Sequence, residues 1–325
     1  MSVARTFAGA LVGLFLIAGT TDRAAAEANY PTRPITLIVP FAAGGPTDIV
    51  ARTISQHMAG TLGQPVVIEN IAGTGGTIAT IRAKRSTPDG YTIIIGHLGT
   101  HAAAVAVYPN LAYDPSSDFE PIGMVAGTPV LILARKDFPA NDLVAFASYV
   151  KANRARMAHA GMGSVSYSFC IFLNHLIGAT PEFTAFNGTG PAMKALVAGQ
   201  VDYMCDQIVT AVPQVKATAI KAYAIGTTER SPALPDVPTS EEAGLPQFRG
   251  SAWNALFAPK GTPKPIVEQL NSALSKALDD DRTRKELVAL GSVLPEGDAR
   301  SPRALADLVK REIARWSGIL QPLAR

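Results

Sequence analysis

Short apolar runs alternate along this chain with segments in which apolar residues recur every three or four positions. A run of about four to eight apolar residues predicts a buried strand, whereas 3–4 spacing predicts a helix that packs one face on a core. The alternation is typical of an α/β fold whose lobes are mainly parallel sheets flanked by helices. The predicted strands are Ile35–Val39, Val66–Asn70, Thr92–Gly96, Ile122–Val125, Val130–Ala134, Ala158–Gly161, Glu182–Phe186, Val201–Cys205, Lys221–Ile225 and Asn254–Phe257.

Three helices are marked by their starts or by their apolar stripes. The first begins at Pro46, because the fixed φ angle of proline suits the first position of a helix. The second follows Thr262 and Pro263, and the third covers residues 305–320. The apolar stripes of the last two predict packing against the core and indicate nothing about function.

Two segments rich in Pro and Gly mark places where the chain is expected to cross between two lobes. They are residues 121–129, which lie between two extended runs, and residues 227–250. Two crossings predict a discontinuous first lobe, residues 29–126 plus 252–325, and a second lobe, residues 127–251. Ligands of open α/β sheets bind beyond the carboxyl ends of the strands, so two facing lobes predict a cleft that closes on a hinge.

Residues 1–28 have the pattern of a secretory signal peptide. Arg5 supplies the positive charge, residues 7–20 form an apolar or small-residue run, and cleavage is expected near Ala26 or Ala28. The run is shorter than the roughly 18 residues of a membrane span, and a retained N-terminal anchor is the competing interpretation. Cleavage predicts a soluble protein in the periplasm.

Charge and composition exclude several classes of partner. The formal net charge is +3 over 325 residues, and the chain has no basic run and no zinc-like Cys/His spacing. Nucleic acid, a metal ion and a cofactor are therefore not expected. The two cysteines, Cys170 and Cys205, would lie in an oxidising compartment, which predicts a disulfide between them. The alternative is two small buried side chains.

Two predicted strands each lead into a glycine-rich turn and then a helix. Residues 40–48 follow the strand Ile35–Val39, and residues 72–77 follow the strand Val66–Asn70. Such turns bring unpaired backbone N–H groups and the positive end of a helix dipole together, which favours an anion. Neither turn contains Lys or Arg, so neutral donors are expected to hold a carboxylate. The predicted binding residues are Phe41, Gly44, Gly45, Thr47, Asp48, Gly75, Gly76 and Thr77.

These positions also have a structural interpretation. The glycines would be needed equally in a tight turn that begins a helix. Asp48, in the first turn of its helix, would repel a bound anion unless its carboxylate turned away. We therefore expect Asp48 to organise the loop.

The second lobe is expected to contact the ligand from the other side of the cleft. Ser164 and Ser166 offer hydroxyl groups, and Asp206 could accept a hydrogen bond from a ligand hydroxyl, a protonated acid or a bridging water. Helix capping is the alternative for all three residues. Thr100 or His101 is the candidate for contact with the distal end of the ligand.

Seven segments follow one another along almost the whole mature chain: Pro40–Arg52, Glu69–Gly76, Pro88–Thr92, Asn187–Pro191, Gly199–Asp202, Arg230–Thr239 and Ala258–Pro263. In this order they resemble the Bug family, the periplasmic receptors of tripartite tricarboxylate transporters. The resemblance implies a two-lobed, type II-like periplasmic-binding-protein fold, a bound carboxylate, and the membrane subunits of such a transporter as partners. Residues 70–73 lack the basic residue and proline that usually follow the asparagine in this family. Residues 96–101 also do not match a family motif. Both departures leave the identity of the carboxylate open.

The sequence thus predicts an extracytoplasmic solute-binding protein, a monomer without enzymatic activity that captures a small mono- or dicarboxylate. It would deliver this ligand to a tripartite tricarboxylate transporter; the alternative is a receptor for a sensor kinase or another signalling partner. A secreted hydrolase using Ser164 is the enzymatic alternative. Against it, the chain has no Gly-x-Ser-x-Gly turn, no Walker lysine and no His-Glu-x-x-His segment.

Overall fold

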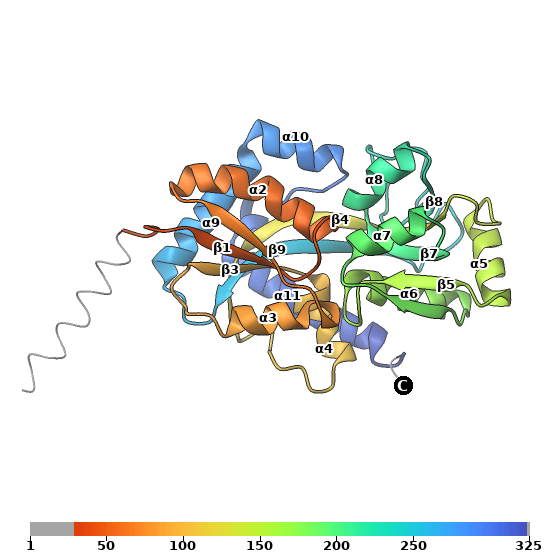
Figure 1. Cartoon of the computed structure of the whole chain (residues 1–325), viewed down its shortest axis with the longest axis horizontal. Helices are drawn as coiled ribbons and strands as arrows, with labels where there is room; N and C mark the ends of the chain where they lie inside the picture. Colours follow the sequence, from red (N-terminus) through yellow and green to blue (C-terminus); the bar gives the residue numbers. More distant parts are fainter. Residues whose placement is uncertain (1–28, 324–325) are drawn as a thin grey trace, which may run out of the picture.

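The computed structural model describes residues 29–323 and consists of two lobes joined by long strands (Figure 1). The predicted signal peptide, residues 1–28, lies outside the described residues. Between residues 29 and 323, no helix combines the length and the apolar character needed to cross a membrane.

The first lobe is built around three parallel strands. β1 (Ile35–Val39) lies between β2 (Val66–Asn70) and β3 (Thr92–His97) and pairs with both. The helix α2 (Pro46–Leu62) connects β1 to β2, and α3 (Thr77–Lys84) lies between β2 and β3 in the chain. These strands and the start of α2 confirm the predictions from hydrophobic patterning and from Pro46, with β3 one residue longer than predicted.

The second lobe repeats this arrangement. β5 (Arg156–His159) pairs in parallel with β6 (Glu182–Ala185) and β7 (Tyr203–Gln207), while β8 (Ile220–Ile225) pairs with β4 (Phe119–Arg135). The predicted strands are present, but β5 begins two residues earlier and β7 two residues later than predicted. The helices that follow β5, β6 and β7 are α6 (Val165–Ile177), α7 (Thr189–Val197) and α8 (Ile208–Lys216).

Two long antiparallel strands join the lobes. The predicted strands Ile122–Val125 and Val130–Ala134 are parts of one strand, β4, which also includes the Pro- and Gly-rich residues between them and pairs with β9 (Ser251–Pro259) in one lobe and with β7 and β8 in the other. Register shifts after Pro121 and after Met124 accommodate the Pro- and Gly-rich sequence without ending the strand. Because β4 and β9 run antiparallel to their neighbours, the sheet is mixed and only its outer strands are parallel.

The predicted lobe boundaries fall at or near these continuous strands. The change from residue 126 to 127 lies inside β4, and the change from residue 251 to 252 lies at the start of β9. The division therefore stays a prediction, and we use "first lobe" for β1–β3 with their flanking helices and "second lobe" for β5–β8 with theirs. The remaining helices and helical turns are η1 (Thr74–Gly76), η2 (Gly99–Ala103), α4 (Ala104–Val107), α5 (Leu143–Ala152), α9 (Lys264–Asp279), α10 (Asp281–Ala289), η3 (Gly297–Arg300) and α11 (Pro302–Leu320).

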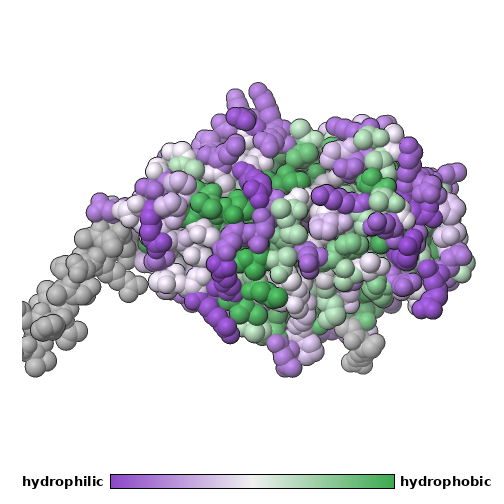
Figure 2. Space-filling model, in the orientation of Figure 1, coloured by the Kyte–Doolittle hydropathy of each residue, from purple (hydrophilic) through white to green (hydrophobic). Residues whose placement is uncertain are grey.

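Both faces of the sheet are buried under helices. Along β1, Leu37 belongs to one hydrophobic cluster and Ile38 to the other, as the alternation of side chains in a strand requires. Each cluster continues into the second lobe through β4, where Leu131 and Ile132 alternate in the same way. Hydrophilic residues cover much of the outer surface in the view of Figure 2. The joined core places the carboxyl ends of the strands of the two lobes opposite each other.

Candidate functional site

The first glycine turn connects β1 to α2 and leaves the start of the helix without a side-chain cap. Gly45 has an extended backbone (φ −84°) at the N-cap and, having no side chain, offers no capping oxygen. Pro46 follows at the first helical position. The donors of the first turn of α2 are thus free of a capping oxygen and lie beside the cleft, as an anion site requires.

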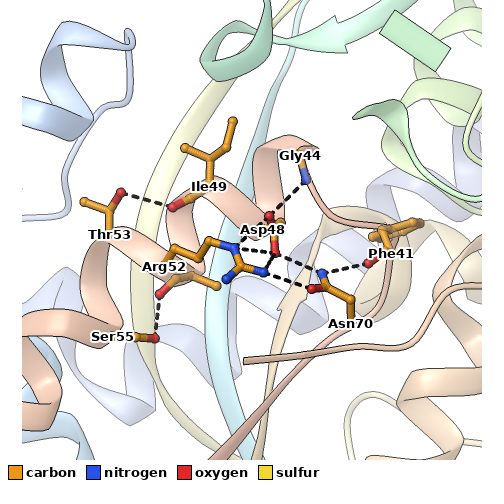
Figure 3. A network of polar contacts seen from close by, with 9 residues as sticks. Phe41, Gly44, Asp48, Ile49, Arg52, Thr53, Ser55 and Asn70 are labelled. Carbon is orange, nitrogen blue, oxygen red and sulfur yellow. Dashed lines mark hydrogen bonds and ion pairs between the residues drawn. The ribbon is translucent and has the colours of Figure 1, made fainter. Parts of the chain in front are cut away.

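A polar network around Asp48 holds this turn in shape (Figure 3). The Asp48 carboxylate accepts hydrogen bonds from the Gly44 N–H (2.9 Å), from Arg52 Nε (3.0 Å) and from Asn70 Nδ2 (2.9 Å). Asn70 Nδ2 also donates to the Phe41 carbonyl (3.0 Å), which ties the turn to the end of β2. Burial would raise the pKa of the Asp48 carboxyl, but the hydrogen bonds from Arg52, Gly44 and Asn70 outweigh it and lower the pKa. This geometry is that of the loop-organising residue expected from the sequence.

The second glycine turn is shaped for contact between the lobes. Gly75 and Gly76 have positive φ angles of 62° and 92°, and Thr77 Oγ1 donates to the Thr74 carbonyl (2.9 Å). A Cβ atom on Gly75 would lie 1.7 Å from the carbonyl oxygen of Met162 in the second lobe. Gly75 therefore lies where the lobes touch, whereas a Cβ atom on Gly76 would meet Thr100 and Phe41 of its own lobe. The lining of the cavity described below includes neither of these glycines, nor Thr77.

The lobes are in direct contact at the mouth of the cleft. The Ala42 N–H donates to the Asn187 carbonyl (3.0 Å), and the Tyr108 hydroxyl, which also lies 3.1 Å from the Thr74 carbonyl of its own lobe, donates to the Met162 carbonyl (2.7 Å). Hydrogen bonds of this kind can form only when the two lobes have approached each other. The described conformation is a closed one.

A narrow cavity lies between the lobes, and in this conformation it has about 10 Å³ of space for a water-sized sphere, roughly the room of one water molecule. Its described lining contains no Lys or Arg. Of the predicted site residues, the lining includes Phe41, Gly45, Thr47, Asp48, Ser164 and Ser166; the others in the lining are Pro46, His97, Ala160, Val165, Thr189 and Gln207.

The second-lobe serines both line the cavity and organise the start of α6. Ser164 is the N-cap: its Oγ accepts from the Tyr167 N–H (3.2 Å) and donates to the Gly161 carbonyl (2.7 Å). Ser166 Oγ accepts from the Ala160 N–H (3.0 Å) and lies 3.1 Å from Ser164 Oγ. The capping interpretation and a place in the cleft are therefore compatible.

Two other predicted residues are buried behind the cavity wall. Thr100 is fully buried, and its hydroxyl contacts His101 Nδ1 (2.9 Å). Asp206 is also fully buried: Oδ2 accepts from the Thr210 hydroxyl (2.6 Å), whereas Oδ1 has no partner among the described residues. Burial raises the pKa of the Asp206 carboxyl to about 7, although hydrogen bonds from Thr210, Gln207 and Thr189 oppose this shift.

The predicted disulfide is not formed in this structure. Cys170, on α6, and Cys205, on β7, are free and buried, although their side chains interact. Burial raises the pKa of the Cys205 thiol, and the interaction with Cys170 adds to the shift. The two residues are neighbours, as expected, but they pack as small buried side chains.

Three polar residues that line the cavity were not among the site residues predicted from the sequence. His97 ends β3, Gln207 ends β7, and Thr189 begins α7. Each is the last or first residue of a regular element at the carboxyl edge of the sheet, which is the position where ligands of α/β proteins bind. The same rule that selected Asp206 could have selected Gln207, the next residue, and His97.

Comparison with known proteins assigns this architecture to one group. The TctC family, described as "Tripartite tricarboxylate transporter family receptor", matches residues 50–324. A UPF0065 protein of Agrobacterium vitis is 40% identical over 91% of this chain and 86% of its own length. BugT of Bordetella pertussis is 30% identical over 96% of each chain.

Solved structures agree in fold over almost the whole chain. MatC of Rhodopseudomonas palustris with bound malate is 54% identical, with a TM-score of 0.88 over 91% of this chain and 100% of its own. The periplasmic binding protein BugD is 41% identical, with a TM-score of 0.88 over 90% of this chain and 98% of its own. An R. palustris protein with adipate is 32% identical, with a TM-score of 0.85 over 91% and 98%.

Replacing Gly75 with alanine should prevent the closed arrangement, because its Cβ would overlap the Met162 carbonyl oxygen. Closure can be measured without a ligand by adding Ala42→Cys and Asn187→Cys across the mouth and following disulfide formation on non-reducing gels. We expect Gly75→Ala to slow this cross-link at least tenfold. Gly44→Ala is the matched control, because Gly44 also has a positive φ angle but a Cβ added there would have no atom within 4 Å. Equal cross-linking rates in the two variants would contradict the assignment of Gly75 to the contact between the lobes.

Replacing Asp206 with asparagine should stabilise the protein more at pH 8 than at pH 5. The pKa of Asp206 rises from 3.8 to about 7 on folding, so its stabilising contribution is present below pH 4 and is lost as pH rises through about 7. Asparagine cannot ionise and resembles the protonated carboxyl group of Asp206 in shape, so the variant avoids the cost of a buried charge at pH 8. We expect its melting temperature at pH 8 to be at least about 3 °C above that of the wild type. The measurement is differential scanning fluorimetry at both pH values.

Asp202→Asn provides the control of opposite sign. Burial would raise the pKa of Asp202, but hydrogen bonds from Arg156 and Arg135 outweigh it and lower the pKa. Its replacement should therefore lower the melting temperature at pH 8. A gain for Asp206→Asn that is the same at both pH values would contradict the buried, proton-binding carboxyl.

Proposed function

This chain belongs to the tripartite tricarboxylate transporter receptor family, and from that premise we propose that it captures a small mono- or dicarboxylate between its two lobes. We propose further that it delivers this ligand to the membrane subunits of a tripartite tricarboxylate transporter. The family is one of periplasmic solute-binding proteins, so capture is the shared function. The ligand and the partner of this chain are the parts that we infer.

The observation that carries the proposal is a narrow cleft between the lobes in which the donors contributed by the described lining residues are neutral. The start of α2, which has no side-chain cap, and the hydroxyl groups of Thr47, Ser164 and Ser166 all lie around it, and they come from both lobes. A ligand that bridges these donors stabilises only the closed arrangement and shifts the population towards it. Two solved relatives carry malate and adipate, which supports a carboxylate as the ligand.

Neutral donors are sufficient in energy. A hydrogen bond to a charged group contributes roughly 1.5–3 kcal/mol, and micromolar affinity needs about 8 kcal/mol. About four to six such bonds exceed this requirement and leave a margin for the lost freedom of the ligand and of the lobes.

The family and the sequence of residues 1–28 support a proposal for the location and the partners. We infer export, cleavage near Ala26 or Ala28, and a mature monomer in the periplasm. The second candidate partner is a sensor kinase that recognises the closed receptor. Closure changes the relative position of the lobes, and either kind of partner could recognise this change.

A hydrolase using Ser164 is not supported by the site. The Ser164 hydroxyl donates to the Gly161 carbonyl, and among the described residues no histidine hydrogen-bonds to it. His159 Nδ1 accepts from the Gly161 N–H (3.0 Å) instead. A serine nucleophile needs a base within hydrogen-bond reach, so we infer a receptor without catalytic activity.

Replacing Gly45 with valine should weaken carboxylate binding at least tenfold. The new Cβ would lie 3.2 Å from Thr189 Oγ1, and the branched side chain would fill the space between the start of α2 and the second lobe. Isothermal titration calorimetry with succinate, malate, glutarate and adipate identifies the ligand in wild type and measures the loss. Gly60→Val is the control, because Gly60 lies on α2 with open space around it. Equal affinities of the wild type and the Gly45 variant would contradict carboxylate binding at the start of α2.

A further inference from the structure

A groove opens on the first lobe, at the end that faces away from the second lobe. There the start of β4 and the end of β9 meet the first turns of α9 and α11 (Figure 1). The groove has about 720 Å³ of space for a water-sized sphere, which lies within the range of small-molecule sites. Its described lining shares no residue with the lining of the cleft.

The floor of this groove is apolar and is held in place from the interior. The rings of Phe119 and Phe257 meet edge to face, with centroids 6.3 Å apart. His101 stacks on the ring of Phe257 from the inner side, with centroids 4.0 Å apart. An apolar group that lies on such a floor leaves water without depriving a buried polar group of its partner. The apolar lining includes Phe119, Phe257, Val267, Pro302, Ala306 and Val309.

The charges around the floor are unequal in number. The charged lining residues are Glu120, Lys260, Lys264, Glu268, Arg303 and Lys310. Each acid is paired with one of the lysines, Glu120 with Lys260 at 3.0 Å and Glu268 with Lys264 at 3.5 Å. Arg303 and Lys310 are exposed on α11 and have no ion-pair partner within residues 29–323. Four cations and two acids leave the groove with a net charge of +2.

The two unpaired cations lie on the same face of α11. Arg303 and Lys310 are seven residues apart, which is about two helical turns or roughly 10 Å along the axis. Ala306 lies between them and lines the groove with a side chain of one methyl group. The space between the two cations is thus open towards the aromatic floor.

We propose that this groove is a second ligand site, separate from the cleft, and that it binds an amphipathic monocarboxylate, an unbranched alkyl chain with one anionic head group. The head group would pair with Arg303 or Lys310, and the chain would lie on the floor formed by Phe119 and Phe257. The argument is charge complementarity: an anion satisfies the unpaired cations, whereas a cation of the same shape is repelled. This site goes beyond the proposed function and does not depend on it.

Two comparisons of ligands test the chain and the charge separately, by isothermal titration calorimetry on the mature protein. Each methylene group that the groove buries should tighten binding about two- to fourfold, so decanoate should bind at least fivefold more tightly than octanoate. Decylammonium has the same chain and the opposite charge, and it should bind at least tenfold more weakly than decanoate. Equal affinities of decanoate and decylammonium would overturn the proposal.

Two variants test the groove itself. The double substitution Arg303→Glu and Lys310→Glu should weaken decanoate at least tenfold, because it turns both unpaired cations into anions. Ala306→Phe fills the space between them without a change of charge and should also weaken decanoate at least tenfold. Arg311→Glu is the control, because Arg311 is exposed on α11 beside Lys310 but does not line the groove. Its affinity should stay within twofold of wild type.

The position of the bound chain can be mapped directly. A decanoate with a diazirine group at the end of its chain should label residues 257–264 or 301–310 on irradiation, as read by peptide mass spectrometry. Labels around Ser164 instead would place the chain in the cleft and overturn the second site. Unchanged decanoate affinity in both groove variants would overturn it as well. Wild type that binds no decanoate but forms dimers, which the double substitution dissociates, would assign the groove to a second copy of the chain and overturn the proposal.

Discussion

A carboxylate that leaves water must find hydrogen-bond donors in the protein, and the described lining of this cleft offers none with a formal charge. Neutral donors stabilise an anion well only when they are held in place beforehand, since each must be aimed at the ligand. The Asp48 network meets this need at the first turn. Arg52, the cation in this region, is paired with Asp48 and so organises the loop.

The same requirement explains why the site is divided between lobes that share two strands. β4 and β9 continue from one lobe into the other, so a bend within them can change the width of the cleft without breaking either core. Contacts between backbone groups, such as that of Ala42 with Asn187, close the mouth in one defined arrangement. In the function that we propose, closure would remove water and bring donors from both lobes to one ligand.

Much of the fold could be predicted from the sequence because each signal was local. Apolar runs placed β1 and β2, and Pro46 placed the start of α2. Residues 122–125 and 130–134 were predicted as two separate strands, and their continuity as β4 could not be predicted because glycine and proline lie between them. Pairing with β9, far away in the sequence, supplies the hydrogen bonds that keep this segment extended. The mixed sheet follows from the same long-range pairing.

The candidate site was predicted where it depends on turn chemistry and was missed where it depends on side-chain orientation. Gly45, Thr47, Ser164 and Ser166 reach the cavity because their turns are defined within a few residues. Asp206 and Gln207 are consecutive, and a strand turns consecutive side chains to opposite faces, so only one of the two could line the cavity. The pairing of β7 with β4 turns Gln207 to the cavity, where its Oε1 accepts hydrogen bonds from Thr128 and Asn254, two residues remote in sequence. Long-range partners of this kind are not identified by any local pattern, whereas the glycine turns that precede α2 and α3 are, because their geometry is set within a few residues.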